Sequence, residues 1–163
     1  SGANITLARR YGWAPKGKRS RGSVPRNYDQ NLTLFASLSL EGITSAMVLD
    51  GAADGLSCQL YVERILVPTL VPRQLVIMDN LSAHKQAPIR RAIEAAGCRV
   101  LFLPSYSPDM TPIEEAFSKI KAILRRVGAR TREALEAAIA EAIDLVTTHD
   151  AQGFFRHCGY VAQ

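Results

Sequence analysis

Two short apolar runs, each followed by polar residues, lie in the middle of the chain. Residues 75–78 (Leu-Val-Ile-Met) precede Asp79, and residues 100–103 (Val-Leu-Phe-Leu) lead into a segment rich in serine and proline. A continuous apolar run of this length is typical of a strand that is buried on both faces of a parallel sheet. The carboxyl ends of such strands face the ligand-binding crevice of an α/β protein. We therefore expect Asp79 to lie where a ligand can bind.

The pattern before these runs predicts two antiparallel strands and a helix. Apolar residues alternate over residues 32–40 and return over residues 44–49, with a turn at Glu41-Gly42. Helical spacing follows over residues 56–67. We expect that helix to stop before Pro68, because the proline ring clashes with the preceding turn.

Three further helices follow from the same reasoning. The first runs from residue 86 or 87 to residue 96 and ends at Gly97, a common left-handed stop. The second contains Glu114 and has one apolar stripe, and the third spans residues 131–146. The order strand, strand, helix, strand, helix, strand, helix predicts an α/β fold.

Glu114 lies at the edge of the apolar stripe of its helix. The same flank carries three polar side chains at helical spacing: Ser118, Lys121 and Arg125. This arrangement suits a metal site with DNA passing over it, and it also suits a solvated flank in which Glu115 pairs with Lys119. Sequence alone leaves both interpretations open.

Asp79 and Glu114 are candidate ligands for Mg²⁺ or Mn²⁺, which prefer carboxylate oxygens. Purely structural roles are equally compatible with the local sequence. Asp79-Asn80 is typical of an Asx turn or a helix cap, and residues 111–114 (Thr-Pro-Ile-Glu) are typical of a capping box.

The longer motifs are more specific. Residues 78–85 (Met-Asp-Asn-Leu-Ser-Ala-His-Lys) and residues 103–114 resemble the catalytic domain of DDE transposases of the mariner and related bacterial insertion-sequence superfamily. The 34 residues between Asp79 and Glu114 match the spacing of that superfamily. The resemblance implies a ribonuclease H-like mixed sheet with flanking helices. It also implies that Asp79 and Glu114 are the second and third catalytic acids and metal ligands.

The activity implied by this resemblance is Mg²⁺- or Mn²⁺-dependent DNA cleavage and strand transfer during transposition, with two ions in a complete site. In the family, the first catalytic Asp stands in an Asp-Glu pair directly before the Ser-Gly with which this chain starts. None of the nearby acids Asp29, Asp50 and Asp54 has the flanking sequence to replace it. We therefore expect residues 1–163 to form a catalytic domain that lacks this acid and most of the central strand.

Three alternatives for function remain open at this stage. The chain is an active transposase domain, a non-catalytic DNA-binding remnant of one, or an unrelated phosphate-handling α/β protein, which the matched spacing disfavours. A second departure from the family is Thr111, where the family usually has Asn. Whether the chain is an enzyme is not decided by its sequence.

Charge indicates a polyanionic partner. The net charge is +5, and residues 1–30 hold seven Lys and Arg residues against one Asp. We expect the following residues to contact DNA: Lys16, Lys18, Arg19, Arg21, His84, Lys85, Lys121 and Arg125. The resemblance implies transposon ends and target DNA as partners, and a homodimer is compatible with it.

Composition fits one globular domain. The chain has 163 residues, of which 47% are hydrophobic, and no apolar run approaches the roughly 20 residues of a membrane span. We expect no membrane partner and a cytoplasmic location. Cys58, Cys98 and Cys158 lack the spacing of a disulfide framework or a zinc site, so we expect buried, reduced thiols.

Overall fold

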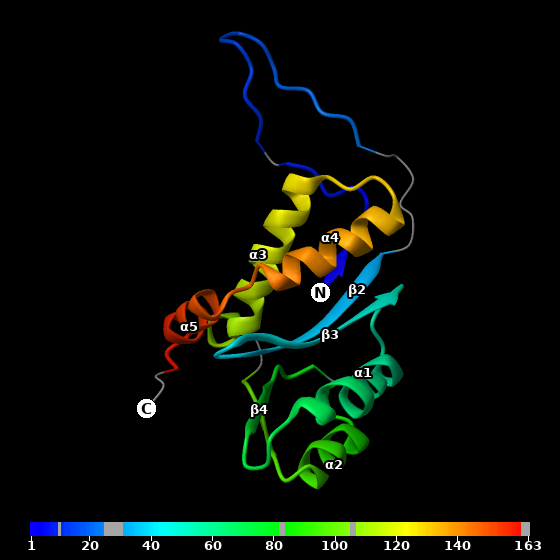
Figure 1. Ribbon diagram of the computed structural model, residues 1–163, viewed down its shortest axis with the longest axis vertical. Coiled ribbons are helices and arrows are strands. Elements are labelled where there is room, and N and C mark those ends of the chain that lie inside the picture. The colour runs from blue at the N-terminus through cyan, green and yellow to red at the C-terminus, as the bar shows by residue number, and fades with distance from the viewer. Residues whose placement is uncertain (10, 25–30, 82–83, 105–106, 161–163) are drawn as a thin grey trace.

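The computed structural model describes residues 1–9, 11–24, 31–81, 84–104 and 107–160 (Figure 1). Its first sheet is antiparallel and has the order β1-β2-β3, formed by Gly2–Ala3, Leu32–Ser39 and Gly42–Asp50. The second sheet pairs β4 (Leu75–Met78) with β5 (Arg99–Phe102) in parallel. All four strands predicted from the apolar pattern are therefore confirmed.

Two helices cover one face of the antiparallel sheet. α3 (Pro112–Val127) and α4 (Arg132–Asp144) pack against it around Leu32, Leu34 and Ile120, which are at most 4% exposed. α3 ends at Gly128, whose φ of 64° is left-handed, as is usual at a helix C-terminus. Both helices were predicted from their apolar stripes.

The opposite face of β2 and β3 packs against a second group of helical segments. α1 (Gly55–Tyr61) continues into a π-helical turn, η1 (Val62–Leu66), and a 3₁₀ turn, η2 (Val67–Thr69). The prediction that helical structure stops before Pro68 is wrong. Pro68 lies in the first turn of the new 3₁₀ segment, where a proline N–H would have no helical partner in any case.

α2 (Ala87–Ala95) lies beside η1 and β5 and ends as predicted, before Gly97 with φ 75°. Buried side chains join these segments into a second core: Cys58, Tyr61, Val62, Leu66, Ile89, Ile93 and Cys98. Of the three cysteines, Cys58 and Cys98 are buried, whereas Cys158 is partly exposed. The two cores lie on opposite faces of β2 and β3, which gives the expected mixed α/β arrangement.

The sequence did not predict α5 (Thr148–His157), which packs against α3. Thr147 and Asp150 form a capping box at its start, and Asp150 also accepts a hydrogen bond from Lys119. The interpretation that pairs Glu115 with Lys119 is therefore wrong. Glu115 instead contacts His157, because α5 brings both partners to the exposed side of α3.

None of the helices in the described part of the chain is both long enough and apolar enough to cross a membrane.

Candidate functional site

Asp79 follows the last residue of β4, as the apolar pattern predicts. Its side chain is 41% exposed, and the Nδ1 atom of His84 donates a hydrogen bond to its Oδ1 atom. The backbone N–H of Leu81 also points to Oδ1, at 3.4 Å. The short loop after β4 thus holds Asp79 in an Asx-type turn while leaving part of its carboxylate open to solvent.

The thiol of Cys58 lies close enough to Asp79 for the carboxylate charge to act on it. Burial, and to a lesser degree the negative charge of Asp79, raises the pKa of Cys58 to about 11. Cys58 is therefore a neutral thiol at neutral pH. Hard cations such as Mg²⁺ prefer a carboxylate oxygen, such as that of Asp79, to sulfur.

Glu114 lies in the first turn of α3 and is exposed. Its backbone N–H donates to the carbonyl of Thr111 at 3.0 Å, but the Thr111 side chain makes no cap to the helix. The Thr111 hydroxyl instead donates to the carbonyl of Ser107. The capping-box prediction is therefore wrong, and the carboxylate of Glu114 is not needed to start the helix.

The amino group of Ser1 lies close to this helix. It donates to the carbonyl of Leu34 at 2.7 Å, which places the start of β1 beside β2. Burial is the main cause of its lowered pKa; the charge of Lys121 lowers it further and the charge of Glu114 opposes the shift. A residue bonded to Ser1 in a longer chain would therefore emerge near both Glu114 and Lys121.

The predicted DNA-contacting residues occur in three places. Lys16, Lys18, Arg19 and Arg21 are exposed on a segment without helix or strand that projects away from the body, drawn in blue in Figure 1. His84 and Lys85 follow Asp79, and Lys121 and Arg125 lie on α3. The structure brings His84 to Asp79 and Lys121 to the Ser1–Glu114 region, whereas the projecting segment extends from the end of the molecule opposite β4 (Figure 1).

The donor chemistry of the two acids fits a divalent metal ion. Within the described ranges, no group of three or more His, Cys, Asp or Glu residues is close enough to hold one. Mg²⁺ commonly uses only one or two protein carboxylates and completes its coordination with water and substrate phosphates. Asp79 and Glu114 each carry a carboxylate, the type of oxygen donor that Mg²⁺ takes from proteins.

Comparison with known proteins gives a family and a fold. A family model described as DDE superfamily endonuclease matches residues 1–136. No curated protein sequence shows significant similarity to this chain.

Solved structures of the Mos1 transposase are similar over 79% to 97% of this chain in the three cases given below. The paired-end complex with the left transposon end has 17% identity and a TM-score of 0.72, with 97% of this chain and 49% of that chain covered. The mariner Mos1 paired-end complex with Mg has 16% identity and a TM-score of 0.69, with 96% and 50% covered. The catalytic domain of the mariner Mos1 transposase has 17% identity and a TM-score of 0.61, with 79% and 68% covered.

This chain therefore spans about half the length of the first two Mos1 chains. The similarity confirms the ribonuclease H-like fold expected from the sequence.

Proposed function

Since this chain belongs to the DDE superfamily of endonucleases, we propose that it is a transposase catalytic domain that cleaves DNA and transfers strands during transposition. The observation that carries this proposal is the position of Asp79 and Glu114. One acid follows a parallel strand and the other opens a helix, and neither carboxylate is consumed by a helix cap. Both remain available as oxygen ligands.

In this proposal Asp79 and Glu114 hold divalent metal ions, Mg²⁺ or Mn²⁺. Such ions, when bound, supply Lewis-acid activation and neutralise charge on a phosphodiester. The paired-end complex of mariner Mos1 with Mg agrees with this chemistry. His84 would orient the Asp79 carboxylate by donating to Oδ1, while 41% of the Asp79 side chain stays exposed.

The first catalytic acid of the family pattern would be the Asp of an Asp-Glu pair, two residues before Ser1. The charge of Glu114 acts on the Ser1 amino group, so an Asp at that position would lie in the same region of the molecule. The residue types and the local geometry support this assignment. In a longer chain, an Asp-Glu pair before Ser1 would complete the catalytic acids.

The DNA partner follows from the distribution of cations. Lys121 and Arg125 on α3, with Lys85 after β4, would contact DNA phosphates, and they lie on the same elements as the two acids or next to them. Lys16, Lys18, Arg19 and Arg21 would contact DNA farther away, because their segment projects from the body. We propose transposon ends and target DNA as the substrates, and a homodimer as the assembly that brings two ends together.

A nicking assay tests the catalytic proposal. The chain carrying an Asp-Glu pair before Ser1 is expected to nick supercoiled plasmid DNA only with Mg²⁺ or Mn²⁺. Asp79→Asn in that protein should lower the rate at least about 100-fold, because a metal ligand is lost. The matched control Asp144→Asn changes an exposed acid at the end of α4 and should leave the rate unchanged. Wild-type rates for Asp79→Asn would contradict the proposal.

A second candidate function is DNA binding without cleavage. It is favoured by the lack of a three-ligand cluster among the described residues. In that case the chain of residues 1–163 binds DNA in a salt-sensitive manner and does not nick it with Mg²⁺. Robust nicking by residues 1–163 alone would refute this candidate.

A further inference from the structure

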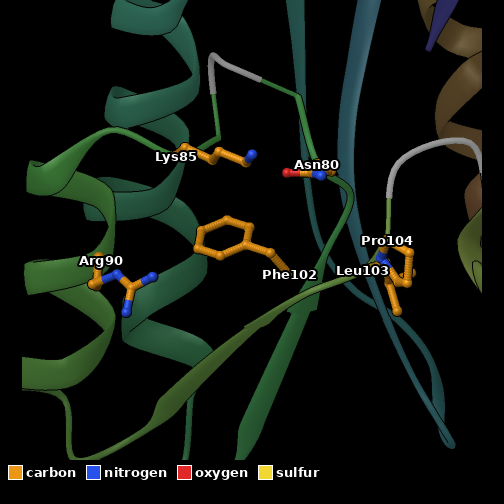
Figure 2. Close-up of a pocket in the computed structure, with 6 residues that line it drawn as sticks. All are labelled: Asn80, Lys85, Arg90, Phe102, Leu103 and Pro104. Atoms are coloured by element: carbon orange, nitrogen blue, oxygen red, sulfur yellow. The ribbon is translucent and has the colours of Figure 1, made fainter.

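An open cavity of about 560 Å³ lies beside the residue that follows Asp79. Its lining comes from the segment between β4 and α2, from α2 itself, and from the end of β5 and the residues after it: Asn80, Lys85, Arg90, Phe102, Leu103 and Pro104. Figure 2 shows the Lys85 side chain extending toward Asn80, with the Phe102 ring below and Arg90 on the α2 side. Three elements thus bring cationic, aromatic and amide groups to one space.

The aromatic ring is held in place by a cation. The Cζ atom of Arg90 lies 5.4 Å from the centre of the Phe102 ring, a cation–π distance. Arg90 is also 3.9 Å from Glu94 across one helical turn, with both side chains about half exposed. Arg90 therefore contacts one face of Phe102, and Phe102 also lines the cavity, where a planar ligand can meet an aromatic ring.

Among the residues that the structure describes, the cavity lining carries positive charge and no acid. Lys85 and Arg90 suit a phosphate, and Phe102 suits a nucleobase. A volume of this size accommodates one nucleotide. Base–aromatic stacking combined with cations along the backbone is the general mode by which proteins bind single-stranded nucleic acid.

We propose that this cavity binds one unpaired nucleotide of the DNA, with its base on Phe102 and its phosphate on Lys85. The inference rests on the proposed function, because it assumes that DNA is the partner. Asn80 is the next residue after Asp79, so the cavity adjoins the acid assigned to metal binding. A base can enter only after leaving the duplex stack, so the cavity favours DNA that is locally unpaired near the cleavage site.

Fluorescence anisotropy with two labelled duplexes tests this inference. One duplex is fully paired, and the other has the same sequence with one additional unpaired nucleotide. The wild-type chain is expected to bind the second duplex about tenfold more tightly, as one base–aromatic stack allows. Phe102→Leu should remove this preference while its affinity for the paired duplex stays within about twofold, and Phe102→Tyr should keep it.

Two further variants show whether the preference for the unpaired nucleotide depends on the cavity or only on the net charge of the chain. Lys85→Gln, an exposed substitution that should not disturb folding, is expected to reduce the preference as well. Arg156→Gln removes an exposed cation on α5, away from the cavity, and should leave the preference unchanged.

The outcomes distinguish this inference from the function on which it rests. Equal affinity of the wild type for both duplexes, or a preference retained by Phe102→Leu and Lys85→Gln, would overturn the nucleotide site and leave DNA binding intact. Binding to neither duplex would overturn both proposals. A preference lost in Arg156→Gln would show that it reflects net charge rather than the cavity.

Discussion

The ion pair between Lys119 and Asp150 joins α3 to α5. Its Nζ–Oδ2 distance is 2.5 Å, and both side chains are about one-quarter to one-third exposed. The hydrogen bond from Lys119, followed by those from Thr147, lowers the pKa of Asp150 from its ordinary 3.8 to about 2. A carboxyl with a lowered folded-state pKa stabilises the fold at any pH above its unfolded-state pKa.

This contribution should therefore disappear as the pH falls from about 4 to about 2. We expect Asp150→Asn to lower the urea midpoint at pH 6 and to match the wild type near pH 2, measured by circular dichroism. Asp144→Asn, at an exposed site, is the control and should show little effect at either pH. If the difference in urea midpoint between Asp150→Asn and the wild type stayed constant from pH 6 to pH 2, this account would be contradicted.

Among the secondary-structure elements, α3 connects the candidate site to the core. Glu114 stands in its first turn, and Ile120, two turns later, is 2% exposed between the sheet and α4. Ile120→Ala should lower the free energy of unfolding by about 2–5 kcal/mol, because it leaves a cavity in this core. Chemical denaturation measures this loss.

The control for this substitution lies on the same helix. Val127→Ala changes a side chain at the end of α3 that is 53% exposed, and it should change stability by no more than about 0.5 kcal/mol. If both variants lost the same free energy of unfolding, the burial of Ile120 would not be what stabilises α3 against the sheet.

The sequence predicted the elements whose apolar periodicity is strong. The stripe of α3, the alternation in β2 and β3 and the glycine after α2 all specify local structure, and the structure confirms each of them. It missed α5, a short helix with Gly153 near its middle and Ala151 as its one buried residue. A ten-residue helix with a glycine near its middle has a weak intrinsic preference for helix, so propensity gives little indication of it.

Contacts between elements were less predictable than the elements themselves. Glu115 has a helical neighbour at Lys119, but it contacts His157, 42 residues away in sequence. The cation–π contact between Arg90 and Phe102 likewise depends on how α2 packs against β5. The sequence could single out Asp79 and Glu114 as candidate site residues because each lies in a recognisable local pattern, the end of an apolar strand or the start of a helix. The side chains around them could not be predicted, because these depend on tertiary packing.

Over the whole molecule, positive charge is concentrated on the projecting segment. Replacing Lys16, Lys18, Arg19 and Arg21 with Gln should reduce the slope of log affinity for duplex DNA against log salt by about 3 to 4, if all four contact phosphates. Anisotropy titrations between 50 and 200 mM salt would measure this slope.

The matched control replaces four other exposed arginines with Gln: Arg64, Arg73, Arg99 and Arg156. This control has the same net charge as the variant of the projecting segment, and it should change the salt slope by less. Equal slopes for the two variants would mean that the projecting segment has no special role in binding DNA.

The central claim is that Asp79 and Glu114 bind a divalent metal ion, and titration with Mn²⁺ followed by electron paramagnetic resonance tests it most directly. With an Asp-Glu pair before Ser1, we expect Asp79→Asn and Glu114→Gln each to weaken Mn²⁺ binding at least about tenfold. The control Glu133→Gln alters an acid in the first turn of α4 and should bind Mn²⁺ like the parent protein. Unchanged Mn²⁺ affinity in both site variants would contradict the assignment of these two acids.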